Sequence, residues 1–237
     1  MPRNGRQARA RASLEPASRN NPGVKRAVLL DALGTILWLE PPWEHADPAA
    51  FAGIAPEKVR EGFLAEMGYY MERTDEGGDP DSLADLRRRC AAILSGVVGR
   101  EISVEVMMAA IRFQPFPETV PALRELRERG LRLVCVSNWD CSLPEVLEAL
   151  ELAPLFDAVV TSASSGARKP DPAIFRAGLA AAGASTTEAL HVGDSDEDVA
   201  GARAAGIDVL RIDRAGPGDR PGEIASLTEI SHHLGSR

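Results

Sequence analysis

An aspartate stands directly after a short apolar run near the start of this chain. The run is Val28-Leu29-Leu30, and Asp31 follows it, with Gly34 three residues further on. An uninterrupted apolar run of this kind is typical of a strand that is buried on both faces of a sheet. Open α/β sheets bind their ligands beyond the carboxyl ends of such strands. Asp31 is therefore a candidate for the chemistry of this protein.

Two later apolar runs also end in polar residues. The run 134–136 is followed by Ser137 and Asn138, and the run 190–192 leads into an acidic stretch over 194–198. A hydroxyl and free backbone N–H groups at a strand end can hold the non-transferred oxygens of a phosphoryl group. Within the acidic stretch, Asp194 and Asp198 are one helical turn apart, so both carboxylates can approach Asp31 and form the oxygen-rich kind of site that Mg²⁺ prefers.

A lysine precedes a helix start in a chain with few lysines. Lys169 lies between Arg168 and Pro170, and after residue 26 the only other lysine is Lys58. An ammonium group and a helix N-terminus both favour negative charge in a transition state. We therefore interpret Lys169 as a site residue, and Arg168 beside it as an ordinary surface residue.

Five β-like runs alternate with helical patterns, which predicts an α/β fold with a parallel sheet. The runs cover about 27–33, 131–136, 157–161, 189–193 and 207–212. Nearly a hundred residues separate the first run from the second, far more than a crossover helix needs, and apolar residues recur there at helical spacing. We expect a Rossmann-like core flanked by helices over 27–40 and 114–237, a helical cap inserted over 41–113, and a disordered basic tail over 1–26.

Charge and cysteine content exclude several classes of protein. The net charge is −8, but residues 1–26 contribute +6, which leaves −14 for the rest of the chain. An acidic body is a poor binder of nucleic acid, because that binding depends on clustered Lys and Arg. Three cysteines without a Cys-x-x-Cys pair suggest neither a disulfide framework nor a zinc site. This cysteine pattern fits a reducing cytosol, so we expect a cytoplasmic protein. The N-terminal stretch lacks an apolar run of transmembrane length, and no membrane partner is expected.

Together these segments resemble the haloacid dehalogenase superfamily, in the subgroup with a helical cap after the first strand, over residues 27–215. Members use an aspartate nucleophile, a Ser or Thr, a Lys and an acidic pair in this order. The resemblance implies Mg²⁺ as cofactor and catalytic roles for Asp31 and Lys169. It implies that the phosphate is bound by Thr35, Ser137, Asn138 and Lys169, and the metal by Asp31, the main-chain carbonyl of Leu33, Asp194 and Asp198.

Leu33 departs from the pattern of most phosphatases of this superfamily, which carry a second aspartate at that position. The second aspartate protonates the leaving alkoxide and then activates water, and a leucine side chain can do neither. Loss of general acid–base help typically costs ~10²–10⁴-fold in rate. A substitute acid near the cap hinge is one solution, and the candidates are Glu40, Glu44, His45 and Asp47.

Three other functions fit parts of the pattern. A haloacid dehalogenase needs no proton for its leaving halide, but its relatives lack the metal-binding aspartate and use an arginine that is absent from 34–57. A carbon–phosphorus hydrolase would need a cap lysine, for which Lys58 is the one candidate. A non-catalytic protein that binds a phosphate-bearing ligand would also tolerate Leu33.

The retained acidic pair favours metal-dependent phosphoryl chemistry over these alternatives. We expect Mg²⁺-dependent hydrolysis of a phosphate ester through an aspartyl-enzyme intermediate, with a small phosphorylated metabolite as substrate. No nucleic-acid or membrane partner is expected, and the protein is expected to be a monomer or a homodimer.

Overall fold

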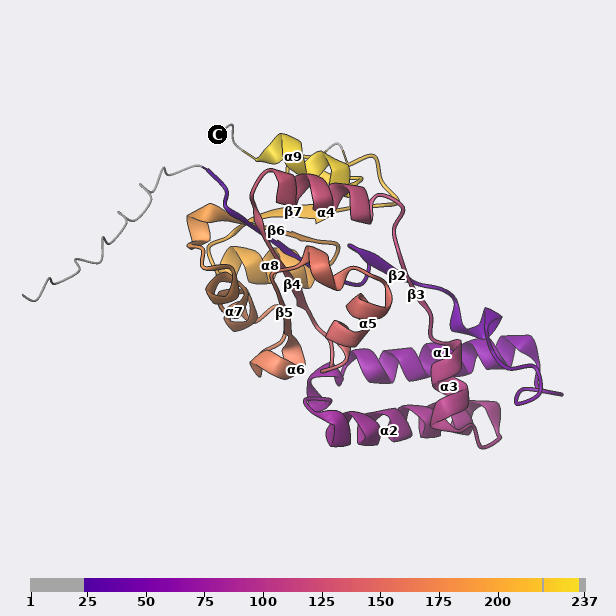
Figure 1. Ribbon diagram of the computed structural model, residues 1–237. Helices are drawn as coiled ribbons and strands as arrows, with labels where there is room; N and C mark the ends of the chain where they lie inside the picture. The colour runs from indigo at the N-terminus through magenta and orange to yellow at the C-terminus, as the bar shows by residue number, and fades with distance from the viewer. Residues whose placement is uncertain (1–23, 219, 235–237) are drawn as a thin grey trace, which may run out of the picture.

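The strand that precedes Asp31 lies near the centre of a six-stranded parallel sheet. The computed structural model describes residues 24–218 and 220–234. The strands follow the spatial order β5-β4-β1-β6-β7-β8 (Figure 1). Their bounds are β1 (Ala27–Leu30), β4 (Arg132–Ser137), β5 (Ala158–Thr161), β6 (Ala189–Gly193), β7 (Asp208–Ile212) and β8 (Glu223–Ile224). The predicted α/β fold with a parallel, Rossmann-like sheet is confirmed.

The register of the three central strands brings their polar ends together. Leu30 pairs with Cys135 of β4 on one side and with Val192 of β6 on the other. The N–H of Asp31 still donates to the carbonyl of Val192, at 2.9 Å. Because the strands are parallel and level at this point, the residues that follow each of them share one edge of the sheet.

Helices cover both faces of the sheet, and the alternation of side chains along β1 shows the two layers. Val28 and Leu30 pack in one core with α4 (Thr119–Glu128), α5 (Leu143–Ala149) and α9 (Ile230–His233). Ala27 and Leu29 pack in a second core with α7 (Pro172–Ala182) and α8 (Asp196–Ala204). A short helix, α6 (Ser162–Ser165), follows β5. All four residues of β1 are fully buried, as its uninterrupted apolar sequence predicts.

Three helices between residues 56 and 110 form a separate layer, which we call the cap. They are α1 (Pro56–Met71), α2 (Pro80–Val98) and α3 (Val104–Ala110), and they pack around their own apolar cluster. Figure 1 shows them grouped to one side of the sheet. An antiparallel ribbon of β2 (Leu37–Leu39) and β3 (Phe113–Pro115) carries the chain into and out of the cap. The two connections therefore lie side by side.

The first strand ends earlier than the sequence predicts. It stops at Leu30, because the carbonyl of Ala32 accepts from the N–H groups of Ile36 and Leu37 and so closes a tight turn. Gly34 supplies a positive φ of 83° within that turn.

The core also begins earlier than predicted at its N-terminal side. Lys25 donates to the carbonyls of Thr187 and Ala189, although it was assigned to the tail. Residues 1–23 of the predicted tail lie outside the described residues. Within the described part of the chain, no helix combines the length and apolarity that a bilayer crossing requires.

Arg214, just beyond β7, ties both connections to the core. Its guanidinium donates to the carbonyls of Gly34, at 3.1 Å, and of Thr35, both in the turn after Asp31. It also pairs with Glu118 at 2.5 Å and lies 3.4 Å from the ring centroid of Phe116, both in the segment that follows β3. One side chain therefore fixes the turn that carries Asp31 and the return from the cap.

We expect Arg214→Met to lower the free energy of unfolding by about 1–3 kcal/mol, because it leaves the two carbonyls of the turn without their donor. Urea denaturation measures the change. The matched control is Arg220→Met, which removes an exposed guanidinium paired at 3.6 Å with Glu223, and it should stay within about 0.5 kcal/mol of the wild type. Equal effects of the two substitutions would show that Arg214 has no anchoring role.

Candidate active site

Asp31, Ser137 and Lys169 meet at the edge of the sheet. The Oδ1 atom of Asp31 accepts a hydrogen bond from the Ser137 hydroxyl at 2.9 Å and one from the Lys169 ammonium at 2.5 Å. Burial raises the pKa of Asp31 to about 6, even though the charge of Lys169 acts to lower it. Both donors bind the same carboxylate oxygen, so they fix the orientation of the carboxyl group and leave Oδ2 outside both hydrogen bonds.

Lys169 is buried between two carboxylates. Its ammonium is 2.5 Å from Asp31 Oδ1 and 2.5 Å from Asp198 Oδ1, and the residue is 3% exposed. Burial acts to lower its pKa, but the two carboxylates outweigh burial and hold the pKa above the ordinary value. Lys169 is therefore a fixed cation.

The side chain of Asn138 holds the backbone of Lys169. Its Oδ1 accepts from the Lys169 N–H at 2.7 Å, and its Nδ2 donates to the Lys169 carbonyl at 3.1 Å. Nδ2 also donates to Glu197 at 3.0 Å. Asn138 was predicted to bind phosphate, and its side-chain amide is engaged in positioning the lysine.

Asp198 is held on both of its oxygens. Besides Lys169, Oδ1 contacts His191 Nε2 at 2.8 Å, while Oδ2 accepts from the Ser195 hydroxyl at 2.5 Å. Burial acts to raise the pKa of Asp198, but Lys169 and His191 hold it well below its usual range. Asp198 is therefore a permanent anion that positions Lys169.

Three carboxyl groups, those of Asp31, Asp194 and Asp198, form an acidic cluster. Each offers an oxygen, and these oxygens lie within 4.8 Å of one another. Burial and the charge of Asp198 raise the pKa of Asp194. Three carboxylates face the single ammonium of Lys169, so the charge at this point favours a further cation.

Gly34 makes the approach of Asp194 to the first strand feasible. A Cβ built on Gly34 would lie 2.2 Å from Asp194 Oδ2, a distance that no real side chain tolerates, and the positive φ disfavours any other residue. The glycine that follows Asp31 in the sequence thus creates the space in which the second carboxylate lies.

Several predicted residues are not brought to this cluster. Thr35 is fully buried in the turn, where its hydroxyl has no partner among the described residues, and it does not line the cavity described below. Among the proposed substitute acids, Glu40 pairs with His45 and also accepts from Gln114 at 2.8 Å. None of the four proposed substitutes, Glu40, Glu44, His45 and Asp47, lines the cavity.

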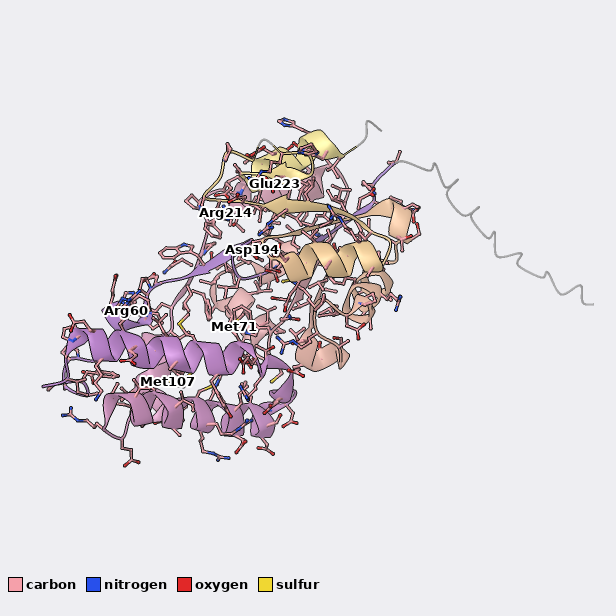
Figure 2. All side chains as sticks on the ribbon, turned by 180° about the vertical axis from the view of Figure 1, so that it is seen from behind. Arg60, Met71, Met107, Asp194, Arg214 and Glu223 are labelled. Atoms are coloured by element: carbon pink, nitrogen blue, oxygen red, sulfur yellow. The ribbon has the colours of Figure 1, made fainter. Side chains whose placement is uncertain are left out.

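A cavity of about 330 Å³ lies between the acidic cluster and the cap. Figure 2 shows Asp194 on the core side and Met71 and Met107 on the cap side, and all three line the cavity. The cap contributes mainly apolar groups, together with Glu66 and Arg87. Leu33 also lines the cavity, and it packs against the apolar core of the sheet at the same time.

Hydrogen bonds hold the cap against the core. The Tyr70 hydroxyl donates to Asp140 at 2.8 Å. Arg168 donates to the carbonyls of Glu72 at 2.8 Å and Met71 at 3.1 Å. Arg168 was interpreted as an ordinary surface residue, and this interpretation is wrong, because its guanidinium binds the C-terminal end of α1.

Glu66 on α1 is a buried acid that affects stability. Only 5% of the residue is exposed, and burial raises the pKa of its carboxyl from 4.5 to about 7. Between these two values the unfolded chain ionises at this residue while the folded chain keeps the proton, so stability falls as the pH rises from 4.5 to 7.

We expect Glu66→Gln to remove this dependence. Between pH 4.5 and 7, the free energy of unfolding of the wild type should fall by about 3 kcal/mol relative to that of the variant. Each unit of pKa shift corresponds to about 1.4 kcal/mol. Urea denaturation at pH 4.5 and pH 8 measures the difference. Glu61→Gln on the exposed side of the same helix is the control and should track the wild type. Parallel pH profiles of Glu66→Gln and the wild type would contradict the assigned pKa.

Comparisons with known proteins agree with this arrangement. The chain is 37% identical over 119 residues to Phosphatase MT3486 of Mycobacterium tuberculosis, and the match covers 49% of this chain and 54% of that protein. The chain spans about half the length of the curated phosphatases that it matches.

Solved structures share the whole fold. A HAD phosphatase from Thermococcus onnurineus is 28% identical, with a TM-score of 0.64 over 89% of this chain and 98% of that one. An L-2-haloacid dehalogenase from Xanthobacter autotrophicus is 22% identical, with a TM-score of 0.67 over 88% of this chain and 97% of that one. At this identity the likeness supports a shared fold only. A family model for haloacid dehalogenase-like hydrolases matches residues 25–206. The chain therefore belongs to the haloacid dehalogenase-like hydrolases.

Proposed function

We propose that this hydrolase cleaves phosphate esters of small molecules with the help of Mg²⁺, through a covalent bond between Asp31 and phosphorus. The observation that carries the proposal is the contact of one buried lysine with Asp31 and Asp198, beside Asp194, at one end of the cavity below the cap. That set combines a nucleophile, a fixed cation and an excess of carboxylates. The phosphatases among the relatives support this reaction class.

The reaction has two steps. In the first, a carboxylate oxygen of Asp31 attacks phosphorus, and the ester P–O bond breaks so that the alcohol oxygen leaves with the electron pair. In the second, water attacks the phosphorus of the aspartyl phosphate, and the bond between phosphorus and the Asp31 oxygen breaks. The carboxylate is regenerated, and inorganic phosphate leaves with the protons of the water. Lys169 stays next to the reacting oxygens and favours the negative charge that develops there. The Ser137 hydroxyl holds Asp31 in place.

The carboxylates fit a divalent cation of the hard kind. Asp31 and Asp194, with the main-chain carbonyl of Leu33, would hold Mg²⁺. Proteins typically bind this ion through one or two carboxylates, and it keeps several waters as its other ligands. Asp198 would support it indirectly, because its oxygens already hold Lys169, His191 and Ser195. When bound, the ion offsets the charge of the cluster and of the phosphoryl group.

Leu33 limits the substrates that this site can hydrolyse quickly. It lines the cavity but offers no proton for the leaving oxygen. Esters whose alcohol leaves easily as an anion depend least on such a proton. We therefore expect activated esters to be better substrates than simple alkyl phosphates.

A haloacid dehalogenase is the second candidate, and the apolar side chain of Leu33 in the cavity favours it. Halide needs no proton to leave, and such a reaction needs no metal. Release of halide from haloacids in excess chelator would establish this function. A non-catalytic phosphate-binding protein is the third candidate, and binding without turnover would identify it.

The three cysteines are unpaired in the structure, which is consistent with a reducing compartment, and we place the protein in the cytoplasm. We expect a small phosphorylated molecule as its ligand, and a monomer or homodimer as its assembly.

Asp31→Asn should abolish hydrolysis of p-nitrophenyl phosphate, because the amide is not a nucleophile. Excess chelator should abolish the wild-type activity, and Mg²⁺ should restore it. Release of p-nitrophenol measures both. Asp171→Asn, which changes the residue at the N-terminal end of α7 that accepts from the N–H of Ala173, is the matched control and should keep most of the activity. Turnover by Asp31→Asn at the wild-type rate would refute the proposed nucleophile.

Leu33→Asp should raise the rate on simple alkyl phosphates by ~10-fold or more, because it places an acid in the cavity where Leu33 now lies. The rate on p-nitrophenyl phosphate should change far less, since that leaving group needs no proton. Release of inorganic phosphate from both substrates gives the ratio. A correctly folded variant with no change in this ratio would show that the position is not aligned with the leaving group.

A further inference from the structure

Glu66 lies in the wall of the cavity and carries a carboxylate oxygen that makes no hydrogen bond to the described residues around it. Its Oε2 atom is buried and has no hydrogen-bond partner in residues 24–218 and 220–234. The residue lines the same cavity as Asp31 and Lys169 but belongs to the cap, on α1. None of the roles proposed for the reaction uses this carboxyl group.

The surroundings of Glu66 do not explain it as a structural residue. The adjoining cap residues that line the cavity are mainly apolar, and they include Met67, Met107 and Ile111. Hydrogen bonding to the Cys90 thiol only partly offsets the effect of burial on its pKa. Arg87 also lines the cavity, yet it does not satisfy Oε2. An unpaired carboxyl in an apolar wall is unfavourable, whereas ligand cavities combine apolar walls with a few polar groups that contact the ligand.

The position of Glu66 along α1 separates it from the end of the helix that contacts the core. The end of α1 contacts the core, since Tyr70 donates to Asp140 and the carbonyl of Met71 accepts from Arg168. Glu66 precedes Met71 by five residues, about 7.5 Å along the helix axis at 1.5 Å per residue. A substrate with its phosphate at Asp31 would meet Glu66 with its organic part.

We propose that Glu66 is the residue of the cap that selects the substrate, by accepting a hydrogen bond from an ammonium or hydroxyl group on the organic part of the phosphate ester. At a pH above about 7 the carboxyl of Glu66 is ionised, and an ionised carboxylate can only accept a hydrogen bond, so its partner must be a donor. A bound ammonium group would also give this buried carboxylate a positively charged partner. The proposal rests on the proposed function, because it requires the phosphate to bind at Asp31.

Alkylphosphonates provide the test, because they keep the charged end of the substrate but cannot be hydrolysed at the P–C bond by phosphate-ester chemistry. We would prepare chains of two to eight carbons that end in ammonium, hydroxyl or methyl, and measure their dissociation constants by calorimetry with the full-length protein and Mg²⁺. At one chain length, the ammonium or hydroxyl compound should bind about 10-fold more tightly than the methyl compound. Which of the two binds better identifies the donor.

Two variants locate the effect. Glu66→Gln keeps the shape of the side chain but not its charge. In this variant the dissociation constants of the ammonium and methyl compounds should become nearly equal. A difference between the hydroxyl and methyl compounds should shrink by a smaller factor. Glu61→Gln, on the exposed side of α1, should retain the wild-type preferences.

The outcomes separate the two proposals. If all phosphonates bind equally tightly whatever their terminal group, the role of Glu66 is overturned and the phosphate site stays intact. A donor preference that survives in Glu66→Gln also overturns that role. If no phosphonate binds at any length and inorganic phosphate does not bind either, the phosphate site fails, and the role of Glu66 fails with it.

Discussion

The ion contacts of one buried lysine underlie the arrangement of this site. Lys169 touches Asp31 and Asp198 at 2.5 Å each, and without it the buried carboxylate of Asp31 would have no cation in contact among the described residues, while Asp198 would keep only His191. Breaking such a buried pair by removing one partner typically costs 3–5 kcal/mol, roughly a third of the stability of a typical domain. The same contact orients Asp31, so stability and the geometry of the proposed nucleophile depend on one ammonium group.

The lysine is fixed by segments that are far apart in the sequence. Asn138, at the end of β4, holds its backbone on both sides, while Asp198 at the start of α8 holds its ammonium. Asp198 is in turn held by His191 from within β6. Because these groups follow or belong to neighbouring parallel strands, the register of the sheet sets their spacing. A displacement of β6 relative to β1 would therefore separate the charges.

Lys169 was predicted from its position before a helix start in a chain with few lysines. The rule that polar residues at strand ends converge made Asp31, Ser137, Asp194 and Asp198 predictable from the sequence. It depends only on local apolar runs and on the parallel sheet they imply. The anchoring roles of Arg214 and Arg168 were not predictable, because their partners are backbone carbonyls distant in the sequence. His191 carried a signal that was overlooked, since a polar residue inside an apolar run needs a buried partner. The facing of Glu66 depends on how α1 packs against α2, which residue spacing alone does not determine.

The cap and the core divide the work of the proposed enzyme between separate parts of the chain. Lys169 and its partners belong to the core, whereas Glu66 belongs to the cap, which has its own apolar cluster. Side chains of the cap can therefore differ without disturbing the ion contacts below. Leu33 is the exception, because it lies two residues from Asp31 and also lines the cavity. Under the proposed function, a change there would act on the leaving group directly, so the range of substrates would depend on this one position of the core as well as on the cap.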